Sequence, residues 1–319
     1  MDKRVMVFAP SPQLTVTIEN LGGEADLHIH AGGQGLWQAR MVASLGVPVA
    51  LCAALGGETG TVLRHLIEAD GIELVEESVL ARNGGCVHDR RDEERKSVAE
   101  APGDPISRHE LDALYERTLL EGLRSETVLL SGPAHGRTVP TEAYGRLAAD
   151  LRVNGCRVLA DLAGERLDVV LEGGLDFVKV SHEELIDDGR AGGDEPKELI
   201  KAMRELRENG ARSVLVSRAD KPALALLDGG KGGKGGKREE IVEVIMPSLH
   251  PVDPRGAGDS MTAAVAASLT QGSSLIEAIR LGAAAGALNV TRRGLGTSGG
   301  DGARKLAERV ELRAFRDGR

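Results

Sequence analysis

Aromatic residues are rare in this sequence. Phe, Trp and Tyr together make up 2% of its 319 residues, so the aromatic platforms on which nucleic-acid bases stack are not expected. Acidic side chains also outnumber basic ones, 49 to 40, and the formal net charge of −9 opposes a general affinity for nucleic acid. We therefore expect no nucleic-acid partner.

Cysteines and long apolar runs are scarce as well. Cys52, Cys86 and Cys156 are far apart and odd in number, so they predict neither a disulfide framework nor a metal site. No apolar stretch approaches the roughly 20 residues that span a bilayer. Residues 1–10 have an apolar centre but no cleavage-type end, which favours a first strand over a leader. We expect a cytoplasmic protein without membrane contact.

Short β-branched runs alternate with longer amphipathic segments along most of the chain. Such alternation predicts an α/β fold in which helices cover both faces of a mainly parallel sheet. Buried parallel strands are predicted over 47–54, 127–130, 157–161, 177–180 and 213–217, with an antiparallel edge over 223–227 and 240–246. Helices are predicted over 36–45, 59–70, 141–153, 195–209, 257–270 and 274–291.

Two segments, 14–29 and 85–99, do not fit this alternation. Both are strand-like, polar at alternate positions and bounded by glycines. They predict either a pair of surface hairpins or a small sheet that acts as a lid. We favour the lid because each segment adjoins a glycine-rich stretch, and enzymes that transfer phosphoryl groups must exclude water. The glycine- and lysine-rich stretch 228–237 lacks phosphate-loop spacing and predicts a hairpin tip.

The most informative motif is Asp253-Pro-Arg-Gly-Ala-Gly-Asp259, directly before the apolar stretch 261–269. Bare backbone amides at a helix start attract anions, phosphate above all. Asp259 is a carboxylate in such a place, which is explained if it takes a proton from a hydroxyl while the amides hold the phosphoryl group. The alternative is a glycine-rich turn in which Asp259 only caps the helix. A second glycine cluster, 31–35, also precedes a helical pattern, and one cluster can bind the acceptor and the other the donor.

Four segments together resemble the ribokinase-like sugar kinases, in particular their phosphofructokinase-B branch. Residues 9–16 are similar to the Asn-Pro-Ala-Leu-Asp opening of that branch, and 31–40 to its Ala-Gly-Gly-Lys-Gly-Ile-Asn-Val-Ala-Arg signature. Residues 179–185 are similar to its Lys-Pro-Asn-x-x-Glu-Leu motif, and 253–259 to its Asp-Thr-x-Gly-Ala-Gly-Asp signature. The resemblance implies one three-layer α/β/α kinase domain over 1–319, with a β-lid from about 13–30 and 84–100.

The resemblance also implies catalytic roles for matching residues. Asp259 would be the catalytic base, and Gly256, Ala257 and Gly258 would supply amides around the transferring phosphoryl group. Glu184 would organise Mg²⁺ and its water shell. Without the neighbouring motif, Glu184 would be interpreted as an exposed glutamate at a helix start.

The resemblance also implies which residues contact the substrate and the nucleotide. Arg82 would reach a substrate phosphate, although an unpaired surface arginine is an equal interpretation. The residues expected to line the sugar pocket are Gln13, Gly32, Gly33, Gln34 and Gly35. The residues expected to contact nucleotide are Ser217, Arg218, Gly258, Gly286 and Asn289, where close helix packing is the alternative for Gly286.

The chain departs from the family pattern mainly on the substrate side. Gln13 stands at the acceptor-binding aspartate, Gln34 at the signature lysine and Trp37 at an asparagine. Ser181 replaces an asparagine in the magnesium motif, and Pro254–Arg255 replaces Thr and a variable residue. The phosphoryl-transfer residues are kept better than the sugar-recognition residues, which favours a kinase with a shifted acceptor.

The leading hypothesis is therefore a kinase that uses ATP and Mg²⁺ to phosphorylate a hydroxyl of a sugar or sugar phosphate. The alternatives are a ribose or nucleoside kinase of the same fold, and a non-catalytic sugar or nucleotide sensor. The presence of both Asp259 and Glu184 opposes the sensor. The lid strands have exposed edges that need covering, so we also expect a homodimer formed through the lid.

Overall fold

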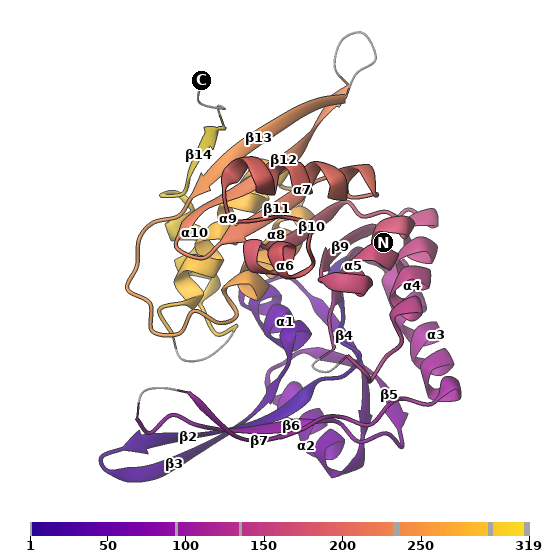
Figure 1. Cartoon of the computed structure of the whole chain (residues 1–319). Coiled ribbons are helices and arrows are strands. Elements are labelled where there is room, and N and C mark those ends of the chain that lie inside the picture. The colour runs from indigo at the N-terminus through magenta and orange to yellow at the C-terminus, as the bar shows by residue number, and fades with distance from the viewer. Residues whose placement is uncertain (1, 93–94, 134–135, 232–236, 293–295, 316–319) are drawn as a thin grey trace.

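Figure 1 shows a computed structural model of the chain, which describes residues 2–92, 95–133, 136–231, 237–292 and 296–315. Its largest element is a sheet with the strand order β14-β13-β12-β11-β10-β9-β8-β1-β4-β5. Pairing is parallel from β5 through to β11 and antiparallel from β11 to β14. The strands are β1 (Asp2–Phe8), β4 (Val49–Gly56), β5 (Glu73–Val79), β8 (Ser125–Ser131), β9 (Arg157–Asp161), β10 (Phe177–Ser181), β11 (Val214–Arg218), β12 (Lys221–Lys231), β13 (Lys237–Ile245) and β14 (Glu311–Ala314).

Helices cover both faces of this sheet, which confirms the predicted three-layer α/β/α class (Figure 1). Alternate residues of a strand point to opposite faces, so Val5 and Val7 enter one core while Met6 and Phe8 enter the other. The first core packs against α1 (Gln34–Ser44), α2 (Gly57–Ala69), α8 (Ala257–Thr270), α9 (Leu275–Asn289) and α10 (Gly300–Ala307). The second packs against α3 (Arg108–Arg124), α4 (Thr141–Val153), α5 (Gly164–Gly173), α6 (His182–Asp187) and α7 (Pro196–Glu208).

A separate four-stranded sheet with the order β3-β2-β6-β7 stands off the main sheet (Figure 1). We call it the lid, and a closing motion stays a prediction. It consists of β2 (Gln13–Leu21), β3 (Glu24–Gly32), β6 (Gly85–Asp89) and β7 (Lys96–Ala101). The small sheet predicted from segments 14–29 and 85–99 is thereby confirmed.

The two faces of the lid differ in polarity. The β2–β3 register places Thr15 opposite His30 and Thr17 opposite His28 on one face. On the other face Ile18 lies opposite Leu27, and both Leu27 and Ile29 are more than half exposed. The lid therefore has a polar side and an apolar side.

Several helices and strands of the structure were not predicted from the sequence. Strand β5 reads Glu-Leu-Val-Glu-Glu-Ser-Val, and its charges lie on an edge strand with only partly buried residues, so it lacks the apolar run of a central strand. Helix α3 has a strongly polar sequence, but its capping box of Ser107 and Glu110 was a readable start signal. Short helices α5, α6 and α10 and strand β14 were also missed.

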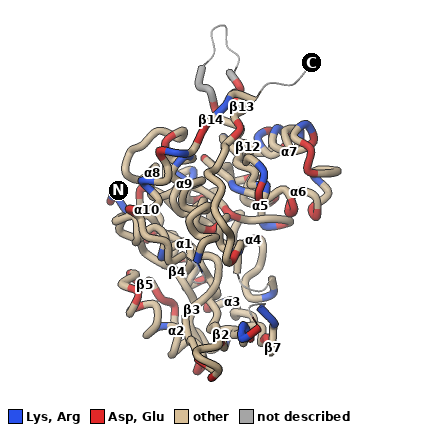
Figure 2. The backbone as a smooth tube through the Cα atoms, turned by 90° about the vertical axis from the view of Figure 1, so that its left-hand side faces the viewer, with Lys and Arg blue, Asp and Glu red and all other residues tan. Residues whose placement is uncertain are grey.

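Figure 2 shows basic and acidic residues interspersed along α7. Among the described residues, no helix is both long and apolar enough to cross a membrane.

Candidate active site

The centre of the site is a buried ion pair at the carboxyl ends of β9 and β10. Lys179 Nζ lies 3.3 Å from Asp161 Oδ1, and both side chains are less than a tenth exposed. Gln38 Nε2 and Thr262 Oγ1 donate to the other Asp161 oxygen at 3.0 and 2.8 Å. Because both oxygens of the carboxylate are bonded, the burial of this charge is compensated.

Asp259 lies beside this pair, in the first turn of α8. Burial and the charge of Asp161 together raise the pKa of Asp259 to about 7, against the charge of Lys179 and a hydrogen bond with Gln34. A carboxyl group that titrates near neutral pH can accept a proton from a hydroxyl and release it again. The electrostatics therefore suit a general base.

The capping alternative for Asp259 is wrong for this structure. The N-cap of α8 is Gly256, which has a left-handed φ of 69° and no side-chain capping hydrogen bond. Among the described residues, the N-cap of α8 thus provides no side-chain acceptor for the first amides, which suits an anion site.

Lys179 adds positive charge at the same point. A Cβ on Gly258 would overlap the Lys179 ammonium, so glycine is needed for this close approach. Burial alone would lower the pKa of Lys179, but the carboxylates of Asp161, Glu184 and Asp259 raise it, and the ammonium stays charged. We call Asp161, Lys179, Glu184 and Asp259 the catalytic cluster.

Glu184 joins the cluster from the start of α6. One of its oxygens, Oε2, accepts from Ser181 N at 2.6 Å and from Ser181 Oγ at 2.8 Å in a capping box. Its charge acts on both Asp161 and Asp259. In the described part of the chain, no group of three His, Cys, Asp or Glu side chains could hold a metal alone. One available carboxylate fits Mg²⁺, which usually keeps several waters and takes further oxygens from substrate phosphates.

The predicted sugar-pocket residues also lie together. Gln13 is paired with Gly32 in the lid, and Gln34 opens α1 two residues later. Gln34 Oε1 accepts from Gly132 N at 2.7 Å, and the same side chain bonds Asp259. Gly33 caps α1 against Pro12, and a Cβ on Gly35 would overlap Ala9. Gln34 thus links the first glycine cluster to the catalytic cluster.

Arg82 lies in the segment between β5 and β6. Its exposed guanidinium pairs with Asp104, with Nε 2.9 Å from Oδ2. A contact with substrate phosphate stays a prediction, and Asp104 would compete with it.

The predicted nucleotide residues have protein partners of their own. The Arg218 guanidinium donates to the carbonyls of Asp194 and Pro222 at 2.9 and 3.3 Å, and the Ser217 carbonyl lies 3.3 Å from His182 Nδ1. These residues adjoin the end of β11, and their nucleotide contacts stay predictions. Residues 232–236 of the predicted hairpin tip lie outside the described part of the chain.

Gly286 and Asn289 support the loop that contains the catalytic motif. A Cβ on Gly286 would lie 2.9 Å from the Ala257 carbonyl, as the close-packing alternative expects. Asn289 is fully buried, donates to the Arg255 carbonyl at 2.7 Å and accepts from Gly296 N at 3.1 Å. Both residues therefore hold the loop in place, and their contact with nucleotide stays a prediction.

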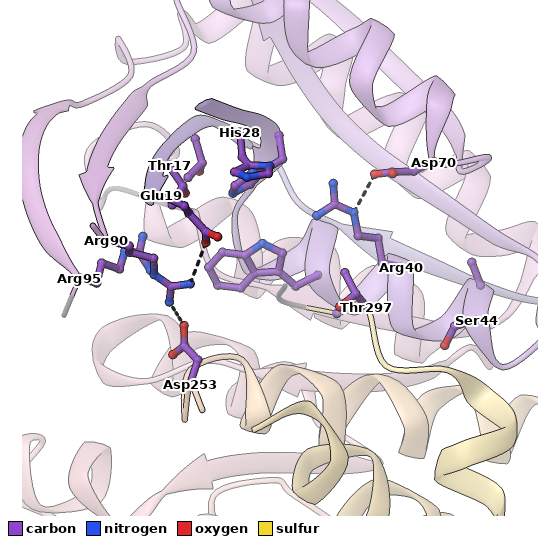
Figure 3. Close-up of a pocket in the computed structure, with 15 residues that line it drawn as sticks. Thr17, Glu19, His28, Arg40, Ser44, Asp70, Arg90, Arg95, Asp253 and Thr297 are labelled. Carbon is purple, nitrogen blue, oxygen red and sulfur yellow. Dashed lines mark hydrogen bonds and ion pairs between the residues drawn. The ribbon is translucent and has the colours of Figure 1, made fainter. Parts of the chain in front are cut away.

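A cavity of about 740 Å³ lies between the polar face of the lid and α1 (Figure 3). Its walls include Thr17, His28 and His30 from the lid, Trp37 and Arg40 from α1, and a part formed by Arg90, Arg95 and Asp253. No role was predicted from the sequence for Asp161, Lys179 or these arginines. Asp161 could have been noticed because it is a carboxylate at the end of a buried strand.

Comparisons with known proteins agree with this geometry. A family profile described as pfkB family carbohydrate kinase matches residues 13–299. The chain is 28% identical over 279 residues to the ATP-dependent 6-phosphofructokinase isozyme 2 of Escherichia coli (strain K12), covering 86% of each chain. It is 26% identical over 271 residues to a 1-phosphofructokinase of Borreliella burgdorferi, covering 84% of this chain and 83% of the other. Among solved structures, a putative phosphofructokinase from Staphylococcus aureus has a TM-score of 0.80 at 20% identity, covering 98% of this chain and 99% of the other.

Proposed function

Because this chain belongs to the pfkB family of carbohydrate kinases, we propose that it transfers the γ-phosphoryl group of ATP to a hydroxyl of a sugar phosphate. A fructose phosphate is the first candidate acceptor, since the relatives above are phosphofructokinases. The observation that supports this proposal most is Asp259, a base with a pKa of about 7 in the first turn of α8.

The catalytic cluster supplies the proton transfer and the charge for this reaction. Asp259 takes the proton of the acceptor hydroxyl as that oxygen attacks. The amides of residues 256–258 and the Lys179 ammonium stabilise the charge on the transferring group. ATP with Mg²⁺, when bound, supplies the phosphoryl group and neutralises phosphate charge, and Glu184 would hold the ion through its water shell.

We further propose that the apolar face of the lid forms a homodimer. Leu27 and Ile29 are each more than half exposed there, at 63% and 55%. A second copy of this face would cover them and the lid edges. Leu27→Glu should convert the protein to a monomer by light scattering, whereas Val153→Glu on α4, which is more exposed, should not. A wild type that is monomeric at micromolar concentration contradicts the dimer.

We also propose that the protein is cytoplasmic. Cys52, Cys86 and Cys156 are all free and buried, which fits a reducing cytoplasm.

The kinase proposal is tested by ATP turnover against a panel of acceptors. The panel should contain fructose 6-phosphate, fructose 1-phosphate, tagatose 6-phosphate, ribose and a nucleoside. We expect turnover with at least one sugar phosphate and a fall of about 10²- to 10⁴-fold in Asp259→Asn, which keeps ATP binding. Turnover only with ribose or the nucleoside would favour the alternative acceptor class, and no turnover with any acceptor would contradict the kinase.

A further inference from the structure

Three arginines lie close together where the lid meets the loop before α8. Arg90 and Arg95 line the cavity under the lid and lie side by side in Figure 3. Arg255 follows Asp253 in the loop, and its charge acts on Arg95. We call these three arginines, together with His88 of β6, the arginine cluster.

Two of the three guanidiniums share one carboxylate. Arg90 pairs with Asp253 and lies 3.9 Å from Glu19. Arg255 contacts the same Asp253, with Nε 2.9 Å from Oδ1 and Nη2 3.0 Å from Oδ2. Arg95 has no ion pair or hydrogen bond with any residue that the structure describes, and its guanidinium is partly buried. Arg95 is therefore the guanidinium of the cluster that is available to an external anion.

His88 is a second sign that a partner is missing. Both of its ring nitrogens are buried, and neither has a hydrogen-bond partner among the described protein atoms. Burial and the charges of Arg95, Arg255 and Arg90 lower the pKa of His88 to about 4, with only Glu100 acting the other way. A buried imidazole without partners is costly, unless a ligand supplies the missing hydrogen bond.

We propose that Arg95, Arg255 and His88 bind the phosphate group of the acceptor sugar. A phosphate has two charges and several acceptor oxygens, which suits two guanidiniums and an imidazole N–H. This inference rests on the proposed function, and it names residues outside the family motifs. Arg255 stands at the variable position of the family signature, and Arg82, the phosphate contact expected from the resemblance, is paired with Asp104.

The position of the cluster suits the acceptor end of the reaction. The loop that contains Arg255 leads within four residues to Asp259, the proposed base. The cavity beside the cluster is large enough for a sugar phosphate, and Trp37 forms part of its wall where the family has a small asparagine. A phosphate bound here would join the lid hairpin to the catalytic loop.

Trp37 makes the proposal testable without an activity assay, because it is the only tryptophan of the sequence. Its fluorescence should change in a saturable way when inorganic phosphate or fructose 6-phosphate is added, and much less with fructose. Arg95→Gln should weaken the binding of both phosphate probes by about 10- to 100-fold, since it removes a charged hydrogen bond. Arg95→Lys should recover part of the loss.

Arg91→Gln is the matched control on the same hairpin, since Arg91 is half exposed and paired with Asp89. It should bind the phosphate probes as the wild type does, and melting temperatures check that each variant is folded. Equal affinities in Arg95→Gln and Arg91→Gln, or no response of the wild type to either phosphate probe, would overturn the proposal. Phosphate binding with the predicted dependence on Arg95 but without ATP turnover would contradict the proposed kinase reaction and support the anion site.

Discussion

The catalytic cluster and the arginine cluster differ in charge pairing. Asp161 has a bonded partner on each oxygen, and Lys179 lies among three carboxylates. Arg95 has no such partner among the described residues, and His88 has two buried nitrogens without hydrogen bonds. The first cluster is complete within the protein, whereas the second requires a ligand.

The same division separates the family residues that this chain keeps from those that it replaces. The groups that would transfer the phosphoryl group belong to packed strands and helices of the main domain. The groups that would recognise the acceptor belong to the lid, to Trp37, where the sequence departs from the family, and to Arg255, at a variable position of the family signature. We infer that chemistry and acceptor recognition are physically separated in this chain.

The largest effect on stability should follow from breaking the buried pair of the catalytic cluster. Lys179→Met leaves Asp161 buried without its counter-charge, so the free energy of unfolding should fall by about 3–5 kcal/mol. Urea unfolding measures this loss. Lys221→Met removes a half-exposed partner of Asp194 and should change stability little. Equal losses of unfolding free energy in the two variants would show that the buried Lys179–Asp161 pair contributes no more to stability than an exposed pair.

Sequence patterns identified the catalytic loop better than its surroundings. Asp259 was found because the glycines around it are adjacent in sequence and signal bare amides. Asp161 and Lys179 were missed as a pair because they come from two neighbouring parallel strands, and only the sheet brings their ends together. Arg95 could not be singled out, since no local signal separates an unpaired arginine from the paired Arg90 and Arg91 on the same hairpin.

The pH dependence of turnover should show the state of Asp259. Its pKa is about 7 and the base must be unprotonated, so turnover should fall as the pH falls below 7, by about tenfold per pH unit. A kcat profile between pH 5.5 and 8.5 measures this limb. A flat profile over that range would contradict the assignment of Asp259 as the base.

The smallest effect should come from Arg82. Its guanidinium is exposed and already paired with Asp104, so Arg82→Gln should change the KM for a sugar phosphate less than about threefold. Steady-state kinetics on the best acceptor tests this. A loss as large as that of Arg95→Gln would instead place the acceptor phosphate at Arg82, as the family resemblance implies.

The separation of chemistry from recognition is tested most directly by steady-state kinetics on Asp259→Asn and Arg95→Gln with the same acceptor. We predict that Asp259→Asn lowers kcat by about 10²-fold or more with little change in the acceptor KM, because the base is lost and the phosphate contacts remain. Arg95→Gln should raise the acceptor KM by about tenfold or more and leave kcat nearly unchanged, because it removes binding only. Variants that both lower kcat, or both raise only KM, would contradict the division between the two clusters.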